Sequence, residues 1–207
     1  MNKKYKTEQE KFWAGEFGDD YIERNMSADL LAANLHYFSR ILENTQEIRS
    51  TFEVGCNIGM NTSALSYLLP NASHSGIEIN QRAVEICRAR AISGDIHQGS
   101  FLDFETDRTF DLVFSKGVLI HLNPDALPDV YNKMAEMSKK YVLIGEYFNP
   151  SPTKINYRGN DDKLFKRDFA DEFLNRHPDF KLINYRFHYK KNTNFSQDDI
   201  TWFLMEK

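Results

Sequence analysis

Cysteine and long apolar runs are scarce in this 207-residue chain. Only Cys56 and Cys87 are present, which excludes a disulfide framework and is typical of proteins from a reducing cytoplasm. No apolar run approaches the length of a membrane span. The N-terminus has lysines but no apolar stretch behind them, so it does not resemble a secretory signal. We therefore expect a cytoplasmic protein that is neither secreted nor membrane-bound.

An excess of basic residues is also missing. The net charge is −4 and the isoelectric point is near 5.9, whereas a general nucleic-acid binder needs a basic face to neutralise phosphates. The histidines are scattered, and no carboxylate–histidine spacing resembles a metal-ligand set. The chain does have 41% hydrophobic residues, which is enough for one sizeable core. Its 207 residues are too few for two full domains. We expect a single domain, 1–207.

Strand-like and helix-like segments alternate through the middle of the chain. Strands are expected at 50–54, 74–80, 95–100, 110–117 and 141–147, and helices at 61–71, 81–91 and 124–140. Such alternation is typical of βαβ units, which build a parallel sheet with helices on both faces. Two helices are expected before this core (49–149), in an N-terminal lid (1–48). The predicted fold class is therefore α/β.

The C-terminal segment, 150–207, has a different pattern and is expected on the substrate side. It predicts a helix at 162–176, followed by strands at 180–190 and 198–207. Because no helix fits between these strands, they should pair antiparallel as a hairpin. The first of them should run parallel to the rest of the sheet. Its following loop, 190–199, is therefore expected at the carboxyl face, where ligands bind in such sheets.

A glycine-containing turn follows the first strand. Its sequence, EVGCNIG (53–59), has Asn57 where nucleotide loops commonly have another glycine. Glycine lets the backbone approach a ligand closely, and asparagine is the non-glycine residue most at ease in the left-handed region. Alone, the motif fits a cofactor loop or a ligand-free strand–helix turn equally well.

Glu78 supplies a second signal. It ends the next strand, nineteen residues after Gly59, where nucleotide-binding βαβ units carry an acid for the ribose hydroxyls. A carboxylate accepts two hydrogen bonds from a cis-diol. A solvated strand-end glutamate is the alternative, but the two signals together favour a nucleotide-like cofactor.

Four segments resemble, in order, the cofactor motifs of class I S-adenosylmethionine-dependent methyltransferases: EVGCNIG (53–59), GIEIN (76–80), GSF (99–101) and FDLVFSKGVLIHL (110–122). The flanks FWAGEFGDDYIERN (12–25), KLFKRDFA (163–170) and QDDITWFLMEK (197–207) are similar to methylases associated with pseudaminic acid biosynthesis. The resemblance implies a Rossmann-like, seven-stranded, mostly parallel sheet with an antiparallel C-terminal hairpin strand. It also implies S-adenosylmethionine as cofactor and an acceptor from that pathway of surface glycan biosynthesis.

The resemblance assigns cofactor contacts residue by residue. Glu53 and the loop after it would hold the methionine end, and Glu78 would take the ribose. Ser100 stands where many members place an aspartate on the adenine amine. The full set lies at four strand ends and on the lid: Tyr21, Arg24, Glu53, Gly55, Cys56, Asn57, Gly59, Asn61, Glu78, Ile79, Ser100, Phe101, Ser115 and Lys116.

Two residues are candidates for catalysis, His121 and Tyr147. A histidine with a pKa near neutrality could accept a proton from a hydroxyl nucleophile. The alternative is a packed, chemically silent histidine, because methyl transfer gains mainly from alignment and a base is optional.

An acidic acceptor, such as an acidic sugar or nucleotide sugar, would need a basic, aromatic-lined pocket. The residues expected there are Lys116, Tyr147, Asn149, Tyr157 and Arg158. Lys116 is unexpected beside a sulfonium cation and could instead be a solvated surface lysine.

Two other functions stay open at this point. A nicotinamide-dependent oxidoreductase is disfavoured because Asn57 breaks the GxGxxG fingerprint and the C-terminal hairpin does not suit it. A non-catalytic cofactor-binding partner in a biosynthetic complex is the second. If the chain is a methyltransferase, a different small-molecule acceptor also remains an alternative. The sequence does not predict the oligomeric state.

Overall fold

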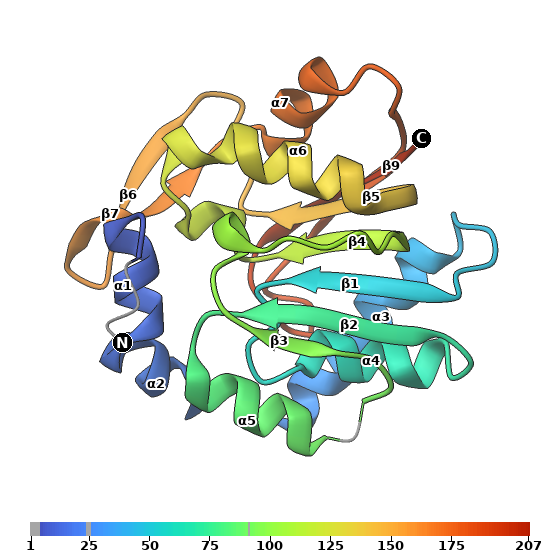
Figure 1. Ribbon diagram of the computed structural model, residues 1–207, viewed down its shortest axis with the longest axis horizontal. Coiled ribbons are helices and arrows are strands. Elements are labelled where there is room, and N and C mark those ends of the chain that lie inside the picture. Colours follow the sequence, from blue (N-terminus) through green and yellow to red (C-terminus); the bar gives the residue numbers. More distant parts are fainter. Residues whose placement is uncertain (1–4, 24–25, 91) are drawn as a thin grey trace.

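The computed structural model describes residues 5–23, 26–90 and 92–207. Its main feature is a seven-stranded sheet with the order β3-β2-β1-β4-β5-β9-β8 and helices on both faces (Figure 1). The strands β1 to β5 pair in parallel, and β9 pairs antiparallel with both β5 and β8. The predicted Rossmann-like sheet with an antiparallel C-terminal hairpin is therefore confirmed. The strands are β1 (Ser50–Val54), β2 (Ser73–Glu78), β3 (Ile96–Gln98), β4 (Phe110–Lys116), β5 (Ser138–Glu146), β8 (Lys181–His188) and β9 (Ile200–Glu206).

The sheet is buried on both faces because its strands alternate their side chains between two apolar cores. Leu112 and Phe114 of β4 belong to the core under α3 and α4, whereas Val113 belongs to the core under α6 and α7. The helices are α1 (Glu8–Ala14), α2 (Glu16–Ile22), α3 (Ala28–Leu42), α4 (Met60–Leu68), α5 (Gln81–Ala89), α6 (Leu127–Met137) and α7 (Phe169–Arg176). Short 3₁₀ turns are η2 (Phe101–Asp103), η3 (Leu119–His121) and η4 (Pro124–Ala126).

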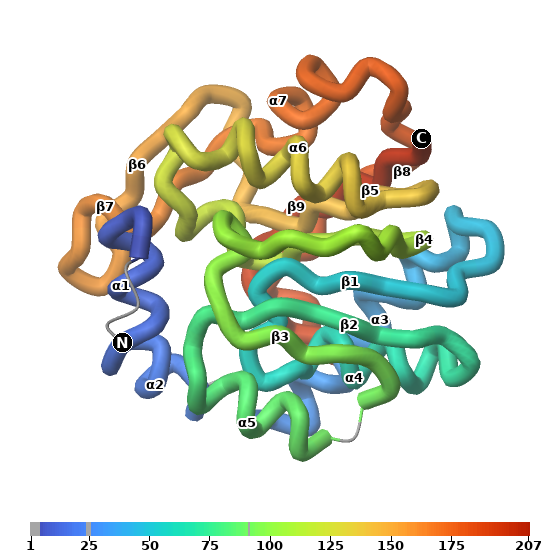
Figure 2. The backbone as a smooth tube through the Cα atoms, viewed as in Figure 1, coloured from blue at the N-terminus to red at the C-terminus, as the bar shows by residue number. Residues whose placement is uncertain are grey.

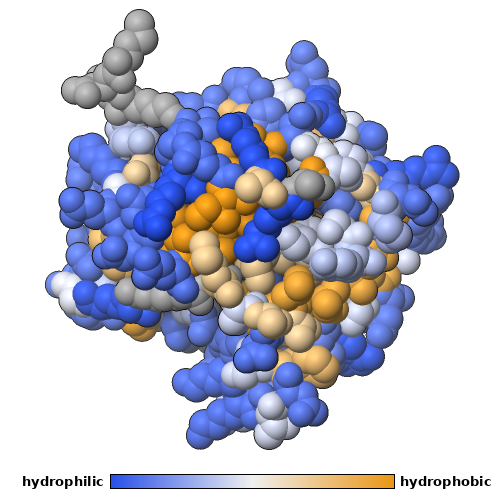
Figure 3. Space-filling model, turned by 90° about the horizontal axis from the view of Figure 1, so that it is seen from below, coloured by the Kyte–Doolittle hydropathy of each residue, from blue (hydrophilic) through white to orange (hydrophobic). Residues whose placement is uncertain are grey.

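In the described part of the N-terminal lid (5–23 and 26–48), three α-helices stand where we expected two. Gly15 separates α1 from α2, and Ser27 caps α3 by accepting a hydrogen bond from the Leu30 amide, 3.0 Å away. A third small core joins α2 to α4 and α5 through Ile22, Ile58 and neighbouring apolar side chains. Seen from below, hydrophobic residues lie in the middle of the surface and toward its lower right, among mostly hydrophilic residues (Figure 3).

The prediction of one helix over 162–176 is wrong. Strands β6 (Thr153–Tyr157) and β7 (Asn160–Lys166) form an antiparallel hairpin, and α7 begins only at Phe169. The turn between the strands puts Arg158 and Gly159 at φ 52° and 85°, the left-handed conformation that tight hairpins require. The hairpin lies beside α1 (Figure 2), where the Gln9 side chain donates to the carbonyl of Asp162 at 3.0 Å.

The predicted helix at 124–140 is also too long. It consists of η4 and α6 and ends at Met137, because the next residue, Ser138, already pairs with Phe110 as the first residue of β5.

Candidate active site

A cavity of about 860 Å³ lies at the carboxyl ends of β1 to β5. The lid, the β6–β7 hairpin and the loop between β8 and β9 complete its wall. Most of the predicted site residues line it: Tyr21, Gly55, Cys56, Asn57, Asn61, Glu78, Ile79, Ser100, Phe101, Lys116, His121, Tyr147, Tyr157 and Arg158. Sequence segments far apart in the chain therefore converge on one cavity.

Four other predicted residues do not line the cavity: Glu53, Gly59, Ser115 and Asn149. Asn149 lies between β5 and β6, where its side-chain amide donates to the Ser151 carbonyl and the Thr153 hydroxyl. Direct ligand contact stays a prediction for these residues. Arg24 falls outside the described part of the chain.

The loop after β1 has left-handed backbone at alternate positions. Gly55, Asn57 and Gly59 have φ values of 70°, 46° and 79°, so the expectation that asparagine replaces a left-handed glycine is confirmed. A Cβ at Gly55 would meet Val118 Cγ2 at 2.7 Å, and one at Gly59 would meet Cys87 Sγ at 2.5 Å. Both glycines are thus required by conformation and by space. The loop exposes backbone to the cavity, as a cofactor loop must.

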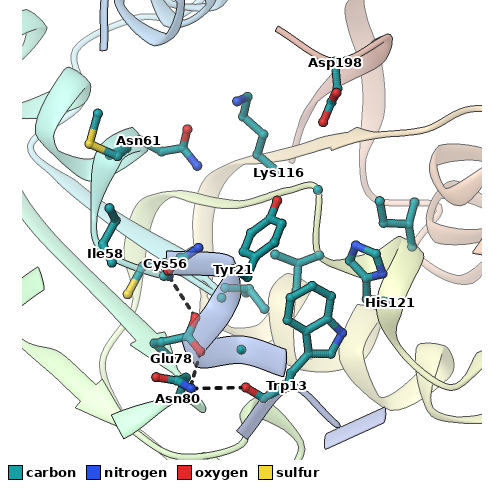
Figure 4. Close-up of a pocket in the computed structure, with 18 of the residues that line it drawn as sticks. Trp13, Tyr21, Cys56, Ile58, Asn61, Glu78, Asn80, Lys116, His121 and Asp198 are labelled. Atoms are coloured by element: carbon teal, nitrogen blue, oxygen red, sulfur yellow. Dashed lines mark hydrogen bonds between the residues drawn. The ribbon is translucent and has the colours of Figure 1, made fainter. Parts of the chain in front are cut away.

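Glu78 lies at the end of β2, directly below this loop (Figure 4). Its Oε2 accepts from the amide of Asn57 and its Oε1 from the amide of Asn80, both at 2.8 Å. Burial raises the pKa of this carboxyl. Asn80 in turn caps α5 and donates to Asp19 on the lid, so the ribose-binding candidate is tied to both elements.

Glu53 supports the loop from behind. Its Oε1 accepts from Asn61 Nδ2 at 2.7 Å and its Oε2 accepts from the Thr62 hydroxyl at 2.5 Å. Burial raises its pKa to about 7. These bonds hold the first turn of α4 and fix the cavity-lining amide of Asn61.

Glu146, at the end of β5, is a buried carboxylate that the sequence left without a role. Its Oε1 accepts from the Ser115 hydroxyl at 2.5 Å and from the backbone amides of Val118 and Leu119 at 3.1 and 3.0 Å. Its Oε2 accepts from the amide of Ile120 at 3.4 Å. Burial raises its pKa to about 7. One carboxylate therefore shapes the turn that follows β4.

His121 ends that turn. Its Nδ1 lies 2.6 Å from the carbonyl oxygen of Lys163, which can only accept, so Nδ1 is the protonated nitrogen and Nε2 carries the lone pair. Burial lowers its pKa to about 4, so the ring is neutral at physiological pH. The ring packs against Trp13 and Tyr157, with centroids 4.6 and 5.1 Å away. This environment suits a packed histidine and leaves only a weak base.

Lys116, at the end of β4, is not a solvated surface lysine. Its Nζ donates to Asn34 Oδ1 at 3.0 Å and lies 5.1 Å from the centroid of the Tyr37 ring. Burial lowers its pKa to about 8. The side chain extends within the cavity toward α3.

The loop between β8 and β9 adds residues that the sequence did not single out. The Tyr147 hydroxyl donates to Asp198 Oδ2 at 2.6 Å, and Lys190, Lys191 and Gln197 also line the cavity. The sheet topology predicted that this loop lies at the carboxyl face. It did not predict which residues the loop contacts, because partners such as Tyr147 and Asp198 are about fifty residues apart in the sequence.

Within residues 5–23, 26–90 and 92–207, no group of three or more His, Cys, Asp or Glu side chains could hold a metal ion. In the same residues, none of the helices has the length and apolar character needed to span a bilayer.

Comparison with known proteins points to methyltransferases. Residues 52–140 match the family model described as a methyltransferase domain. None of the curated protein sequences matches the chain.

Several solved methyltransferase structures share the fold. Magnesium protoporphyrin IX methyltransferase from Synechocystis PCC 6803, with bound S-adenosylhomocysteine, has a TM-score of 0.68 at 11% identity, over 96% of this chain and 97% of that chain. An S-adenosylmethionine-dependent methyltransferase from Clostridium acetobutylicum ATCC 824 has a TM-score of 0.64 at 10% identity, over 92% and 97%. The plantazolicin methyltransferase BpumL, in complex with S-adenosylhomocysteine, has 0.66 at 12% identity, over 96% and 93%. Identities this low show a shared fold.

The matched domain, the fold and the cavity agree with each other. The cavity offers a left-handed loop that exposes backbone and, at its end, a carboxylate suited to ribose hydroxyls, which fits a nucleoside cofactor. Residues 52–140 therefore match a methyltransferase domain, and the chain has the Rossmann-like fold of S-adenosylmethionine-dependent methyltransferases of known structure.

Proposed function

We propose that the protein methylates a small acidic acceptor derived from a sugar, in surface glycan biosynthesis of the pseudaminic acid type. The observation that carries this proposal is a basic rim on the cavity, formed by Arg158, Lys190 and Lys191. These residues come from the β6–β7 turn and from the β8–β9 loop. Two separate segments thus bring cations to the same cavity, which suits a carboxylate or phosphate on the acceptor.

Aromatic side chains accompany the rim. The Arg158 guanidinium lies 5.6 Å from the Tyr157 ring centroid, and the Tyr147 ring has Lys166 Nζ at 5.5 Å. Flat rings beside cations would pack against the faces of a sugar ring while the cations hold its acidic group. This arrangement supports a carbohydrate acid over a purely apolar acceptor.

When bound, the cofactor supplies an electrophilic methyl group on a sulfonium. The chain's own task is then to align the acceptor and to exclude water. Trp13 of the lid covers His121 and closes that side of the cavity. As a weak base, His121 Nε2 would accept no more than a hydrogen bond from a hydroxyl acceptor, whereas an amine acceptor would need no base there. Tyr147, whose proton is held by Asp198, would accept a hydrogen bond through its phenol oxygen.

The proposal is tested by incubating the protein with labelled S-adenosylmethionine and a panel of nonulosonic acids and their nucleotide-linked forms. We expect one added methyl group on an acidic member, by mass spectrometry, and none on the same compound with its carboxylate esterified. Exclusive transfer to neutral compounds would contradict the proposal.

A pair of variants then tests the basic rim. Arg158→Ala should raise KM for the acidic acceptor by about tenfold, the loss of a charged hydrogen bond, without changing the affinity for S-adenosylhomocysteine. Arg186→Ala is the matched control, because Arg186 is exposed on β8 and does not line the cavity. Equal KM values for both variants would remove Arg158 from the acceptor site.

A further inference from the structure

Lys116 is a partly buried cation whose direct partners are neutral. Its Nζ donates to the Asn34 amide oxygen and faces the Tyr37 ring. No ion pair joins it to a carboxylate anywhere in the described residues. An ammonium has three N–H donors, so the bond to Asn34 leaves capacity for an anion.

The nearest acidic residues are already engaged elsewhere. Glu53, Asp198 and Glu146 all act electrostatically on Lys116. However, Glu53 accepts from the start of α4, Asp198 from Tyr147, and Glu146 from the turn after β4. Burying a charge is costly unless it is paired. The missing counter-ion of Lys116 is therefore expected to be a ligand.

Two carboxylates could supply that charge: the one on the methionine part of the cofactor and the one on an acidic acceptor. The position of Lys116 distinguishes them. In Figure 4, Glu78 and Asn80 lie at one end of the cavity, whereas Asn61 and Lys116 lie at the other. The loop 55–59 connects the two ends, since Asn57 is bonded to Glu78 and Asn61 follows the loop directly.

A cofactor with its ribose on Glu78 that lies along this loop directs its amino-acid end toward Asn61 and Lys116. Arg158 of the basic rim is set apart from Lys116, since its neighbour Tyr157 packs against His121, whereas Lys116 is fixed to α3 by Asn34. We propose that Lys116 binds the methionine carboxylate of the cofactor, that Asn34 orients its ammonium, and that the acceptor's acidic group binds at Arg158.

The test compares two ligands that differ only at this end. S-adenosylhomocysteine has the amino-acid carboxylate, and 5′-methylthioadenosine lacks the amino-acid group altogether. Titration calorimetry of Lys116→Met should show S-adenosylhomocysteine binding weakened by about tenfold or more, as for a lost charged hydrogen bond, and 5′-methylthioadenosine binding changed by less than about threefold. Retained binding of the second ligand also shows that the variant is folded.

Lys140→Met is the matched control. Lys140 Nζ also donates to an amide oxygen, that of Gln46 at 2.7 Å, and also lies 5.1 Å from a tyrosine ring, but at the amino end of β5, outside the cavity. This variant should bind both ligands like the wild type.

A second variant covers the case in which Lys116→Met does not fold. Asn34→Asp places a carboxylate where the amide oxygen contacts Lys116, so it should compete with the ligand and weaken S-adenosylhomocysteine but not 5′-methylthioadenosine. Unchanged affinity for S-adenosylhomocysteine, or equal weakening of both ligands, would overturn the proposal. These measurements need no acceptor, so they stand apart from the outcome of the acceptor screen.

Discussion

Replacing Glu146 tests how the turn after β4 is held. In Glu146→Ala, the Ser115 hydroxyl and the backbone amides of residues 118–120 lose their acceptor in a buried site. Leaving a buried donor without an acceptor costs about 1–3 kcal/mol, so the loss of several such bonds should cost at least about 3 kcal/mol. Glu146→Gln keeps an oxygen at the Oε1 position, where three of the four bonds end. The glutamine NH2 group would replace only Oε2, whose one hydrogen bond is the long 3.4 Å contact with the Ile120 amide. Glu146→Gln should therefore lower the free energy of unfolding by no more than about 1 kcal/mol.

The raised pKa of Glu146 predicts the direction in which the stability of Glu146→Gln, relative to the wild type, changes with pH. The folded pKa of Glu146 is raised from 4.5 to about 7, so its protonated form is favoured by folding. The stability it contributes is present below pH 4.5 and is lost as the pH rises through 7. The shift corresponds to at most about 3 kcal/mol. Glu146→Gln cannot ionise, so its stability relative to the wild type should improve by about 2 kcal/mol between pH 5 and pH 8. Glu53 has a pKa shift of the same sign, so the variant should keep part of the dependence.

Urea denaturation at both pH values measures these differences, with Glu136→Ala as control because Glu136 is exposed on α6. Two results would refute the reasoning. One is a loss below about 1 kcal/mol for Glu146→Ala, the level of an ordinary surface change. The other is a pH-independent difference between Glu146→Gln and the wild type.

Two further predictions concern backbone conformation and packing. Asn57→Gly should leave the free energy of unfolding nearly unchanged, whereas Asn57→Val should cost about 1–2 kcal/mol because φ is 46°, and equal effects in urea denaturation would argue against a conformational role. Gly145→Ala should cost about 1–3 kcal/mol, because its Cβ would meet the Tyr37 hydroxyl oxygen at 2.2 Å. Tyr37→Phe removes a buried hydroxyl that has no hydrogen-bond partner in the described residues, so this variant alone should be about as stable as the wild type. It should also restore the stability lost in Gly145→Ala, as measured by thermal unfolding. If the stability changes of the two substitutions were fully additive in the double variant, this reasoning would be contradicted.

Much of the cofactor half of the site was accessible from the sequence, because its signals are local. The position of Asn57 between two glycines predicted its left-handed backbone, and the spacing of Glu78 from the loop predicted that both would meet at one cavity. The hairpin of β6 and β7 was missed for a local reason too. The apolar residues Leu164, Phe165 and Phe169 recur as in a helix, and this pattern hides the strand pairing that the turn at Arg158 and Gly159 makes possible.

Sequence alone determined the alternation of strands and helices, the antiparallel end of the sheet and the loop between Gly55 and Gly59, since each depends on residues close together in the chain. Tertiary structure alone decided which charges meet. Lys116 is hydrogen-bonded to Asn34, which is 82 residues away in the sequence, and Tyr147 to Asp198, which is 51 residues away. Glu146 is hydrogen-bonded to the turn after β4, about thirty residues earlier in the sequence. No periodicity encodes such pairs, because they arise only when the sheet brings strand ends and distant loops to one edge.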